Sequence, residues 1–565
     1  MADEAKKEGA PKAKWDFFRS DHAIGALIGF VYVVWLLATS RELGFPRDEG
    51  FYFHASSDYA RWFDMVLNHA PNAWERSTID GIWGENHEHP ALMKSLFALS
   101  WRYLHEKNHV FEDASTAFRF PTMVFAGVAL WVTYLFGARA FSRRAGAIAA
   151  VMLGLMPNVF FNAHLACFDA PIMTMWLLSV YVYWRSIQQG GFAWAIATGI
   201  VFGLTLETKH NAWILPAVFL PHAIFVSRKV IVREGKLGRL PLPTSIFAMA
   251  ILGPLVFVAL WPWMWNDTLP RVQEYLNFHM NHVYYNIEYL HKNYFGPPSP
   301  RSYAPVLVFA TVSTTTIVLF LVGAYDRLHI LAIRAWSWVR KHDDPHQGDR
   351  AETDVLLFLA LSAPLAVFVL LSKTPIFGGT KHWLPAYPFL AIFAGRGFDV
   401  VGEKIIAAWD RIKSESQRTG VWAVLAAVLV MPPLVIAEHS HPYGLATYVP
   451  FVGGNAGGAD LGLNRQFWGY TTEQLEPYFK EHAPPRATVF INDTAWDSWG
   501  RMIAEKRIRP DLQAVGAPSE GVLAIVHHEL HMSEVDYEEW VAFGTAPDYV
   551  LTHDGVPIIS VYKRK

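Results

Sequence analysis

An acidic pair, Asp48 and Glu49, follows shortly after the first apolar segment of the chain, Ala23–Thr39. A carboxylate that is partly removed from water has a raised pKa and can accept a proton from a substrate hydroxyl at neutral pH. The pair also fits the first turn of a helix, where acidic side chains complement the positive end of the helix dipole. The pair alone therefore indicates either a general base at a membrane interface or a helix start.

A second polar cluster spans residues 85–94, where His87 and His89 stand among glutamates and Lys94 follows. A His-x-His pair with flanking carboxylates could hold a metal ion. The alternative is a polar turn before a helix that starts after Pro90, a residue favoured at the first helical position. The spacing fixes no further metal ligand, so both interpretations stay open.

Asp169 opens another apolar segment and is followed by Pro171. An acid at the start of a membrane helix either caps the helix or lines a polar cavity. The two roles are compatible with each other.

Basic residues also stand at the ends of apolar segments. Lys209 lies between two apolar segments with almost no loop, and Lys381 and His382 stand at the start of a later one. Two cations at one interface could hold the phosphate of a lipid-linked substrate. Lysines at these places also reach lipid head groups by extending their side chains.

The composition indicates which kind of fold must position these residues. Of 565 residues, 52% are hydrophobic and only 17% are charged, against about 25% charged in a soluble domain. This composition predicts a polytopic helical membrane protein with soluble parts. The formal net charge of −2 excludes a bulk basic field for nucleic acid. The single cysteine, Cys167, excludes an intramolecular disulfide.

Apolar runs long enough to cross a bilayer predict eleven spans. They are Ala23–Thr39 and residues 118–138, 145–161, 167–184, 192–207, 211–227, 244–264, 303–323, 353–372, 382–399 and 420–437. Alternate connections between these runs are rich in Arg and Lys, which by the positive-inside rule predicts a cytoplasmic N-terminus and an external C-terminus. We therefore expect a cytoplasmic tail (1–22), a transmembrane domain (23–437) with external loops 41–117 and 265–302, and an external segment 438–565.

The external segments differ in character. Phe51–Met65 and Leu92–Leu104 carry aromatic faces at helical spacing, which predicts helices in the membrane interface. After residue 438 the pattern alternates between strands and helices and predicts a small α/β domain. The predicted strands are Val489–Asn492, Val522–Val526, Tyr549–Leu551 and Ile558–Tyr562, with helices Ser498–Glu505 and Ser533–Phe543 between them. We expect the glycine-rich stretch Gly453–Gly458 to be a flexible connection and not a phosphate-binding loop.

These motifs, in this order, resemble the GT-C glycosyltransferases, and more narrowly the protein O-mannosyltransferase and lipid A aminoarabinose transferase group. The acidic pair is similar to the first motif of the family, and His89–Lys94 is similar to its His-Pro-Pro-Leu-x-Lys motif, with Ala91 in place of the second proline. Thr208-Lys209 and Lys381–Pro388 are similar to later motifs. Residues 448–470 resemble the external segment of some bacterial members.

The resemblance implies an inverting transferase in a bacterial inner membrane, acting at the periplasmic face. Its donor would be a sugar on a polyprenyl phosphate, and its acceptor a hydroxyl of a lipid, polysaccharide or protein. Asp48 would be the general base; Lys209, Lys381 and His382 would hold the donor phosphate. Glu49, Asp169, His89 and Lys94 would orient sugar or acceptor. No cofactor is required by this scheme, and no metal is expected, although a divalent cation stays an alternative.

Two other classes of protein remain open. A transporter or flippase of lipid-linked sugars would place charges near the bilayer midplane and show repeat symmetry, and neither is visible in this sequence. A membrane-anchored interaction protein would leave the acids and cations beside the spans unexplained.

Overall fold

The computed structural model describes residues 20–234, 242–340, 342–346, 351–376, 378–529 and 533–564. Of the predicted cytoplasmic tail, residues 1–22, only residues 20–22 belong to the described part of the chain.

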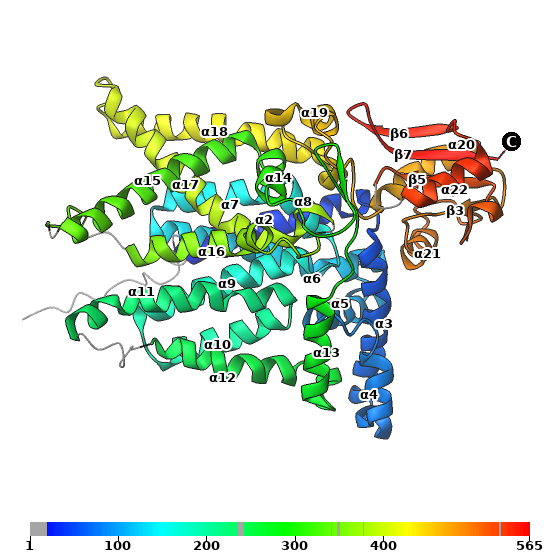
Figure 1. The fold of residues 1–565 in the computed structure, drawn as a ribbon, viewed down its shortest axis with the longest axis horizontal. Coiled ribbons are helices and arrows are strands. Elements are labelled where there is room, and N and C mark those ends of the chain that lie inside the picture. Colours follow the sequence, from blue (N-terminus) through cyan, green and yellow to red (C-terminus); the bar gives the residue numbers. More distant parts are fainter. Residues whose placement is uncertain are drawn as a thin grey trace, which may run out of the picture.

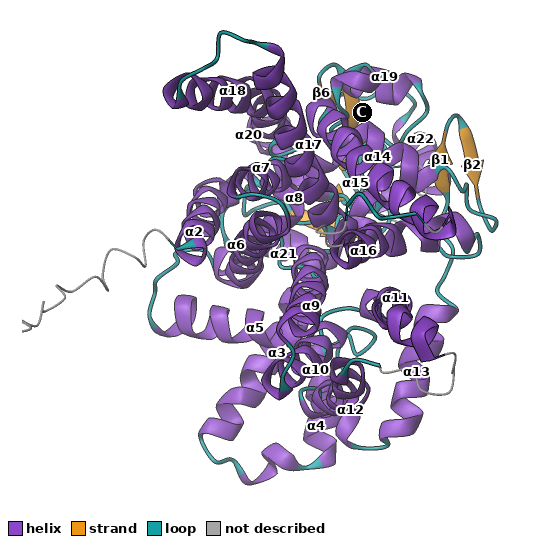
Figure 2. Ribbon diagram, turned by 90° about the vertical axis from the view of Figure 1, so that its left-hand side faces the viewer, coloured by secondary structure: helices purple, strands orange, loops and turns teal. Residues whose placement is uncertain are grey.

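Each of the eleven predicted spans coincides with a helix or a pair of helices. These are α2 (Asp21–Thr39), α6 (Ala114–Ala140), α7 (Arg143–Gly154), α8 (Pro157–His164), α9 (Asp169–Gln189), α10 (Phe192–Leu206), α11 (Pro216–Glu234), α12 (Thr244–Ala259), α14 (Tyr303–Thr311), α15 (Thr314–Arg340), α16 (Ala351–Leu370), α17 (Tyr387–Ala408) and α18 (Glu415–Ser440). Many of them run side by side in a bundle (Figure 1), which Figure 2 views more nearly end-on.

Within the described residues, five helices are long and apolar enough to cross a membrane: α2 with its extension to Glu42, α6, α15, α16 and α18. The pair α7 and α8, bent by 67°, adds a sixth if it is one broken span. Pro157 opens α8 at this bend, where a proline lacks the amide that would continue α7. The chain is thus helical with apolar spans as predicted, but the count of eleven is not confirmed, since five or six spans qualify among the described residues. Helices α10 and α12 are apolar but shorter.

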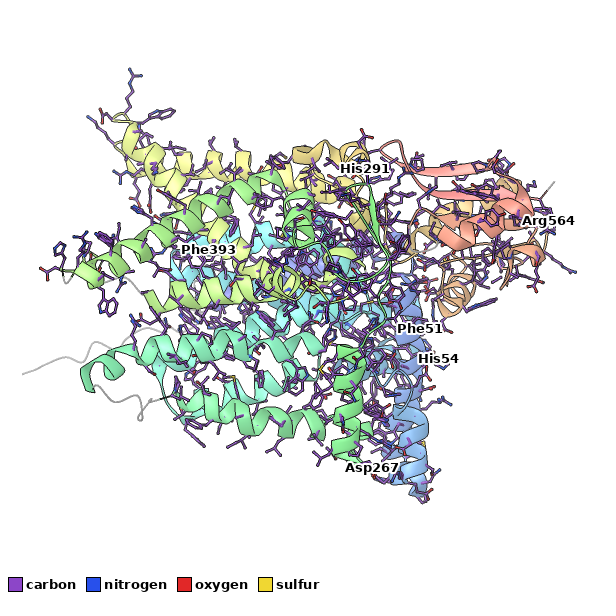
Figure 3. All side chains as sticks on the ribbon, in the orientation of Figure 1. Phe51, His54, Asp267, His291, Phe393 and Arg564 are labelled. Carbon is purple, nitrogen blue, oxygen red and sulfur yellow. The ribbon has the colours of Figure 1, made fainter. Side chains whose placement is uncertain are left out.

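Small residues let some helices of the bundle approach closely. A Cβ on Gly323 of α15 would overlap the carbonyl of Phe393 in α17, and one on Gly397 would overlap the carbonyl of Leu319 in return. Such mutual small-residue contacts are a common way to pack helices within a membrane. Phe393 lies among the side chains that fill the bundle (Figure 3).

Helices of another orientation cross one end of the bundle (Figure 1). They include α3 (Arg47–Leu67), α4 (Arg76–Trp83) and α13 (Thr268–Met280); α5 (Ala91–Ser100), with a π-helical turn over Trp101–Lys107, packs against α3 and α6. Helices α3 and α5 correspond to the two predicted interface helices. Two ion pairs join α4 to the α13 segment: Arg271 to Asp80 at 2.8 Å and Arg76 to Asp267. Asp267 marks this joint in Figure 3, and Phe51 and His54 mark α3.

The strands after residue 487 form one mixed sheet at the same end of the molecule as α3 (Figure 1). The strand order is β4 (Gln513–Val515), β3 (Thr488–Phe490), β5 (Leu523–His527), β7 (Val556–Lys563), β6 (Tyr549–His553), with β3 parallel to β4 and β5 and with β7 antiparallel to β5 and β6. The predicted helices are present as α21 (Trp496–Ala504) and α22 (Ser533–Phe543), and α20 (Glu476–His482) precedes the sheet. The short strand β4 was not predicted. A further hairpin joins β1 (Ile287–Tyr289) to β2 (Lys292–Tyr294).

The glycine-rich stretch is not the loop that its composition suggested. Gly454–Asp460 forms helix α19, and Gly453 precedes it with a φ of 86°, a conformation that glycine adopts without steric cost. Asn455 within this helix accepts a hydrogen bond from the amide of Tyr448 at 2.7 Å. This hydrogen bond attaches the glycine-rich helix to the segment before it.

A fully buried ion pair joins α3 to the bundle. Arg119 of α6 donates to both carboxylate oxygens of Glu49, each at 2.7 Å, and both side chains are 0% exposed. The same guanidinium donates to the carbonyls of Ser40, Leu43 and Gly44 at 2.8–3.0 Å. Glu49 also accepts from the amide of Ala166 at 2.8 Å. The Arg119 side chain thus supplies hydrogen bonds both to the backbone carbonyls of the loop after α2 and to Glu49 at the start of α3.

We predict that Arg119→Met destabilises the protein strongly, because it leaves the Glu49 carboxylate buried without a counter-charge, a change that costs about 3–5 kcal/mol. Thermal unfolding in detergent measures the loss. Arg102→Met is the matched control, since Arg102 pairs with Asp64 where both side chains are about 30% exposed and such a pair contributes about 0–1 kcal/mol. Equal destabilisation by the two variants would contradict this assignment.

Candidate active site

Two carboxylates and two lysines meet at the end of the bundle that α3 crosses. Asp48 is the second residue of α3, and Lys381 lies in the 3₁₀ turn η7 (Gly379–Ala386) that leads into α17. Asp169 opens α9, and Lys209 immediately precedes the 3₁₀ turn η4 (His210–Ile214). Helix starts thus supply both carboxylates, as the sequence predicted, and irregular backbone between helices supplies both lysines.

Lys381 is the buried centre of this cluster. Its Nζ lies 3.3 Å from Oδ2 of Asp48 and 3.8 Å from the centre of the Trp468 ring, and its side chain is 3% exposed. Burial lowers the pKa of Lys381 below its ordinary value, and this effect outweighs the opposing influence of Asp48 and Asp169. A charged lysine in such a dry environment would attract an anion strongly.

Asp48 is more accessible than its partner, with a side chain that is 25% exposed. Burial pushes the pKa of this carboxyl up, but Lys381 and Arg47 together hold it below the usual value. Asp48 is therefore a carboxylate at neutral pH and faces a region that solvent reaches.

The second ion pair is buried on both sides. Lys209 Nζ donates to Oδ1 of Asp169 at 2.6 Å, and the two side chains are 8% and 5% exposed. Lys209 is near enough to Lys381 to contribute to the lowered pKa of the latter, and near enough to Asp48 to favour its ionised form. The structure thus brings Asp48, Asp169, Lys209 and Lys381 into one electrostatic unit with balanced charge.

His382 and His89 lie around this unit. The carbonyl of His382 accepts from Asn211 at 3.1 Å, and its buried ring packs on Phe368. His89 packs its ring against Tyr52 and Phe168, and its Nδ1 is buried and makes no hydrogen bond with the described part of the chain. Burial, with nearby cations, lowers the pKa of His89 well below its ordinary value, so the ring is neutral.

The side chains of Lys94 and Glu49 are buried and hydrogen-bonded within the protein. Lys94 is 0% exposed and its Nζ donates to the carbonyl of Asn86 at 2.6 Å, above the ring of Tyr59. Glu49 is fully enclosed by Arg119 and the amide of Ala166. The predicted contacts of these two side chains with sugar or acceptor stay predictions, while the observed contacts are with the protein itself.

The His-x-His motif does not converge on one point. His87 lies 3.1 Å from Glu274 at the surface, whereas His89 faces His279 with ring centres 6.0 Å apart. In the part of the chain that the structure describes, these residues form no group of three metal-ligating side chains.

The C-terminal segment reaches the site through residues that the sequence did not single out. The carbonyl of Trp468 accepts from the amide of Arg47 at 3.0 Å, and the Arg47 side chain donates to Asp493 at 2.5 Å. The amide of Trp468 donates to Glu529 at 2.8 Å. In the sequence, Trp468 could be noticed only because it lies in the stretch that resembles the family. Asp493 and Glu529 could be connected to the site only once the fold was known.

A small, partly open cavity of about 20 Å³ lies next to Arg47, the residue before Asp48. Its lining also includes Tyr285, Gly378, Asn464, Phe467 and Glu529. Oδ1 of Asn464 is buried and accepts no hydrogen bond from the described residues. The cavity thus has one wall from α3, one from the loop after α13 and one from the C-terminal segment.

Comparison with known proteins gives a family for part of the chain. Residues 105–261 match the model of the dolichyl-phosphate-mannose-protein mannosyltransferase family. This segment holds Arg119, Asp169 and Lys209, and the match confirms there the resemblance that the motifs indicated. No curated protein matches the sequence significantly.

Solved structures of low sequence identity are similar to this chain. ArnT from Cupriavidus metallidurans bound to undecaprenyl phosphate is 14% identical, with a TM-score of 0.46 and coverage of 97% of this chain and 98% of that one. The oligosaccharyltransferase AglB from Archaeoglobus fulgidus, in complex with an inhibitory peptide and a dolichol-phosphate, is 12% identical, with a TM-score of 0.47 and coverage of 91% and 65%. The arabinosyltransferase EmbB from Mycobacterium smegmatis is 14% identical, with a TM-score of 0.33 and coverage of 77% and 43%.

We predict that Lys94 makes stability depend on pH. Burial lowers the pKa of Lys94 to about 7 from its ordinary 10.5. The unfolded chain therefore binds more protons between those values, and the free energy of unfolding rises with pH across that window, by up to about 1.4 kcal/mol per pH unit. Lys94→Met should remove this rise when melting temperatures in detergent are compared between pH 7 and pH 9. The exposed Lys107→Met is the control, and a Lys94→Met curve parallel to wild type would contradict the prediction.

Proposed function

We propose that the chain is a membrane glycosyltransferase that moves a sugar from a polyprenyl-phosphate donor to an acceptor hydroxyl. The observation that carries this proposal is the contact of the partly exposed Asp48 carboxylate with the buried ammonium of Lys381, 3.3 Å away, beside a second buried lysine. The match of residues 105–261 to a family whose donor is a dolichyl-phosphate sugar supports it.

The residues fit an inverting displacement. Asp48 takes the proton of the acceptor hydroxyl, and the hydroxyl oxygen attacks the anomeric carbon of the sugar. The bond from that carbon to the phosphate oxygen breaks, and the lipid phosphate leaves with the electron pair. This leaving group is acidic enough to depart unprotonated, but it needs cations to balance its charge. Lys381 and Lys209 supply them, with His382 as a further donor; no nucleotide or metal is needed for this scheme.

The ion pair links donor binding to the strength of the base. Without donor, Lys381 stabilises the ionised Asp48 and makes it a weak base. A donor phosphate that takes up the charge of Lys381 and Lys209 withdraws this stabilisation, so the pKa of Asp48 rises toward a value useful for proton transfer. The base would thus be activated only when a donor is in place.

The other predicted residues take supporting roles in this proposal. Asp169 holds Lys209, Glu49 fixes the start of α3 next to Asp48, and neutral His89 presents a free Nδ1 toward the sugar. In this proposal the site lies on the external side of the membrane, as the charge pattern of the connections predicts. The resemblance to the family implies that this side is the periplasm of a bacterial inner membrane.

The transporter or flippase alternative is not favoured. Its coupling charges are expected near the bilayer midplane, whereas the four charges here lie at helix starts and in the turns between helices.

We predict that Asp48→Asn lowers transfer by about 10²–10⁴-fold, the usual loss when a general base is removed. The variant keeps the size of the side chain, so folding and donor binding should persist. Transfer from a radiolabelled polyprenyl-phosphate sugar measures the loss. Asp58→Asn on the same helix, where Asp58 pairs only along the helix with Arg61, is the control. Near-normal turnover of Asp48→Asn would end the assignment.

We predict that Lys381→Met and Lys209→Met each weaken donor binding, and that their effects are not additive because both lysines face one phosphate. Binding of labelled donor to the four proteins of the double-mutant cycle gives the coupling. Lys373→Met, an exposed lysine in the loop before η7, is the matched control. Strictly additive losses would show that the lysines act at separate places.

We propose further that the cavity next to Arg47 receives one polar group of the acceptor, so that the C-terminal segment serves the acceptor side. Asn464→Leu should raise the KM for the acceptor about 5-fold, the effect of one lost hydrogen bond of about 1 kcal/mol, and should leave donor hydrolysis unchanged. The exposed Asn281→Leu is the control. An unchanged KM for the acceptor would place the acceptor elsewhere.

A further inference from the structure

A cluster of two histidines and one carboxylate joins the last apolar helix to the C-terminal sheet. His439 lies in the last turn of α18, His553 is the last residue of β6, and Asp554 begins the turn to β7. Each residue offers a ligand atom, and these atoms all lie within 4.8 Å of one another. None of the three residues belongs to the site around Asp48.

The three side chains already face a common point. His439 Nε2 lies 2.9 and 3.0 Å from the two oxygens of Asp554, and the rings of His439 and His553 have centres 5.4 Å apart with an angle of 28° between their planes. Ligand atoms around a tetrahedral Zn²⁺ stand about 3.4 Å apart, since each bond is about 2.1 Å long. Side-chain rotations would have to close separations of up to 4.8 Å by at most about 1.4 Å, and to open the 2.9 Å contact of His439 with Asp554 by about 0.5 Å, to meet that geometry.

We propose that His439, His553 and Asp554 bind Zn²⁺, with a water molecule as the fourth ligand. Imidazole nitrogens together with one carboxylate oxygen suit zinc, while magnesium and calcium prefer all-oxygen sites. The ion would close a loop between residues that stand 115 positions apart in the chain. It would act as a structural link and take no part in sugar transfer.

The surroundings of the cluster have the features of a second ligand shell. Asn455 of α19 donates to Oδ2 of Asp554 at 2.7 Å and so orients the carboxylate, while its own oxygen is held by the amide of Tyr448. His553 packs its ring on Tyr443 with centres 4.6 Å apart. Outer-shell partners of this kind fix the orientation of metal ligands and strengthen binding.

The backbone at Asp554 also agrees with a bound cation. Asp554 adopts a φ of 51°, a left-handed conformation that aspartate tolerates in a turn, and its carboxylate lies against His439.

The link would join three parts of the chain at one point. Through His439 it holds the end of α18, through His553 and Asp554 the sheet, and through Asn455 the helix α19. In Figure 1 the end of α18 lies near α19, on the side of the sheet formed by β6 and β7. A zinc ion here would therefore stabilise the attachment of the C-terminal sheet to the helical bundle.

The test uses the full chain, purified in detergent with a tag that contains no histidine and stripped with a chelator. Zn²⁺ titration followed by metal analysis should give about one zinc per chain in wild type. His553→Ala and Asp554→Asn should each weaken binding at least about 10-fold, and Asn455→Ala about 10–100-fold, as for other outer-shell residues. His482→Ala, an exposed histidine in the same segment, should bind as wild type does.

Two readouts separate the proposal from a change in folding. Zinc at saturating concentration should raise the melting temperature of wild type and of His482→Ala, but not that of Asp554→Asn. Co²⁺ in place of zinc should give wild type the visible absorption of a four-coordinate site. Wild type that binds no zinc, or His553→Ala and Asp554→Asn proteins that bind it as tightly as wild type, would overturn the proposal. Neither result depends on transferase activity, so the zinc site and the proposed function can fail separately.

Discussion

The guanidinium of Arg119 fixes the relation between the bundle and the helix that carries Asp48. All of its charge is neutralised by Glu49, the neighbour of Asp48 in the first turn of α3, and its remaining donors satisfy carbonyls of the loop after α2. An unpaired charge at 0% exposure would be very costly. The start of α3 must therefore stay where Glu49 can pair with Arg119. The position of the proposed base thus follows from an interaction in which the base itself takes no part.

At the buried lysines of the site, the cost of removing charges from water is set against their attraction to nearby carboxylates. Two cations and two carboxylates share a nearly dry region, and each ammonium is already within reach of a carboxylate. Such pairs add little to stability because the loss of hydration offsets their attraction. In the proposed mechanism a donor phosphate replaces Asp48 as the partner of Lys381, and Asp48 then takes up the proton of the acceptor. The four side chains thus have balanced charge before a donor binds.

Much of this arrangement could be predicted from local sequence. Acids at helix starts and cations between apolar runs identified Asp48, Asp169, Lys209 and Lys381, and strand–helix alternation identified most of the C-terminal sheet. The role of Glu49 could not be predicted, because its partner Arg119 lies in the middle of an apolar helix far along the chain. Trp468, Asp493 and Glu529 were missed for the same reason. The prediction of a flexible connection at the glycine-rich helix α19 was wrong, because the contact of Asn455 with Tyr448 cannot be read from local propensity.

The stacking of Trp468 on Lys381 has a consequence for how such proteins can be recombined. The indole comes from the C-terminal segment, whereas the ammonium beneath it belongs to the bundle. The backbone of Trp468 is in turn held by Arg47 and Glu529, one from each part. A chimera that exchanged only the C-terminal segment would therefore also exchange one face of the proposed phosphate site. Donor use and acceptor choice would be inherited together, and natural divergence of one would constrain the other.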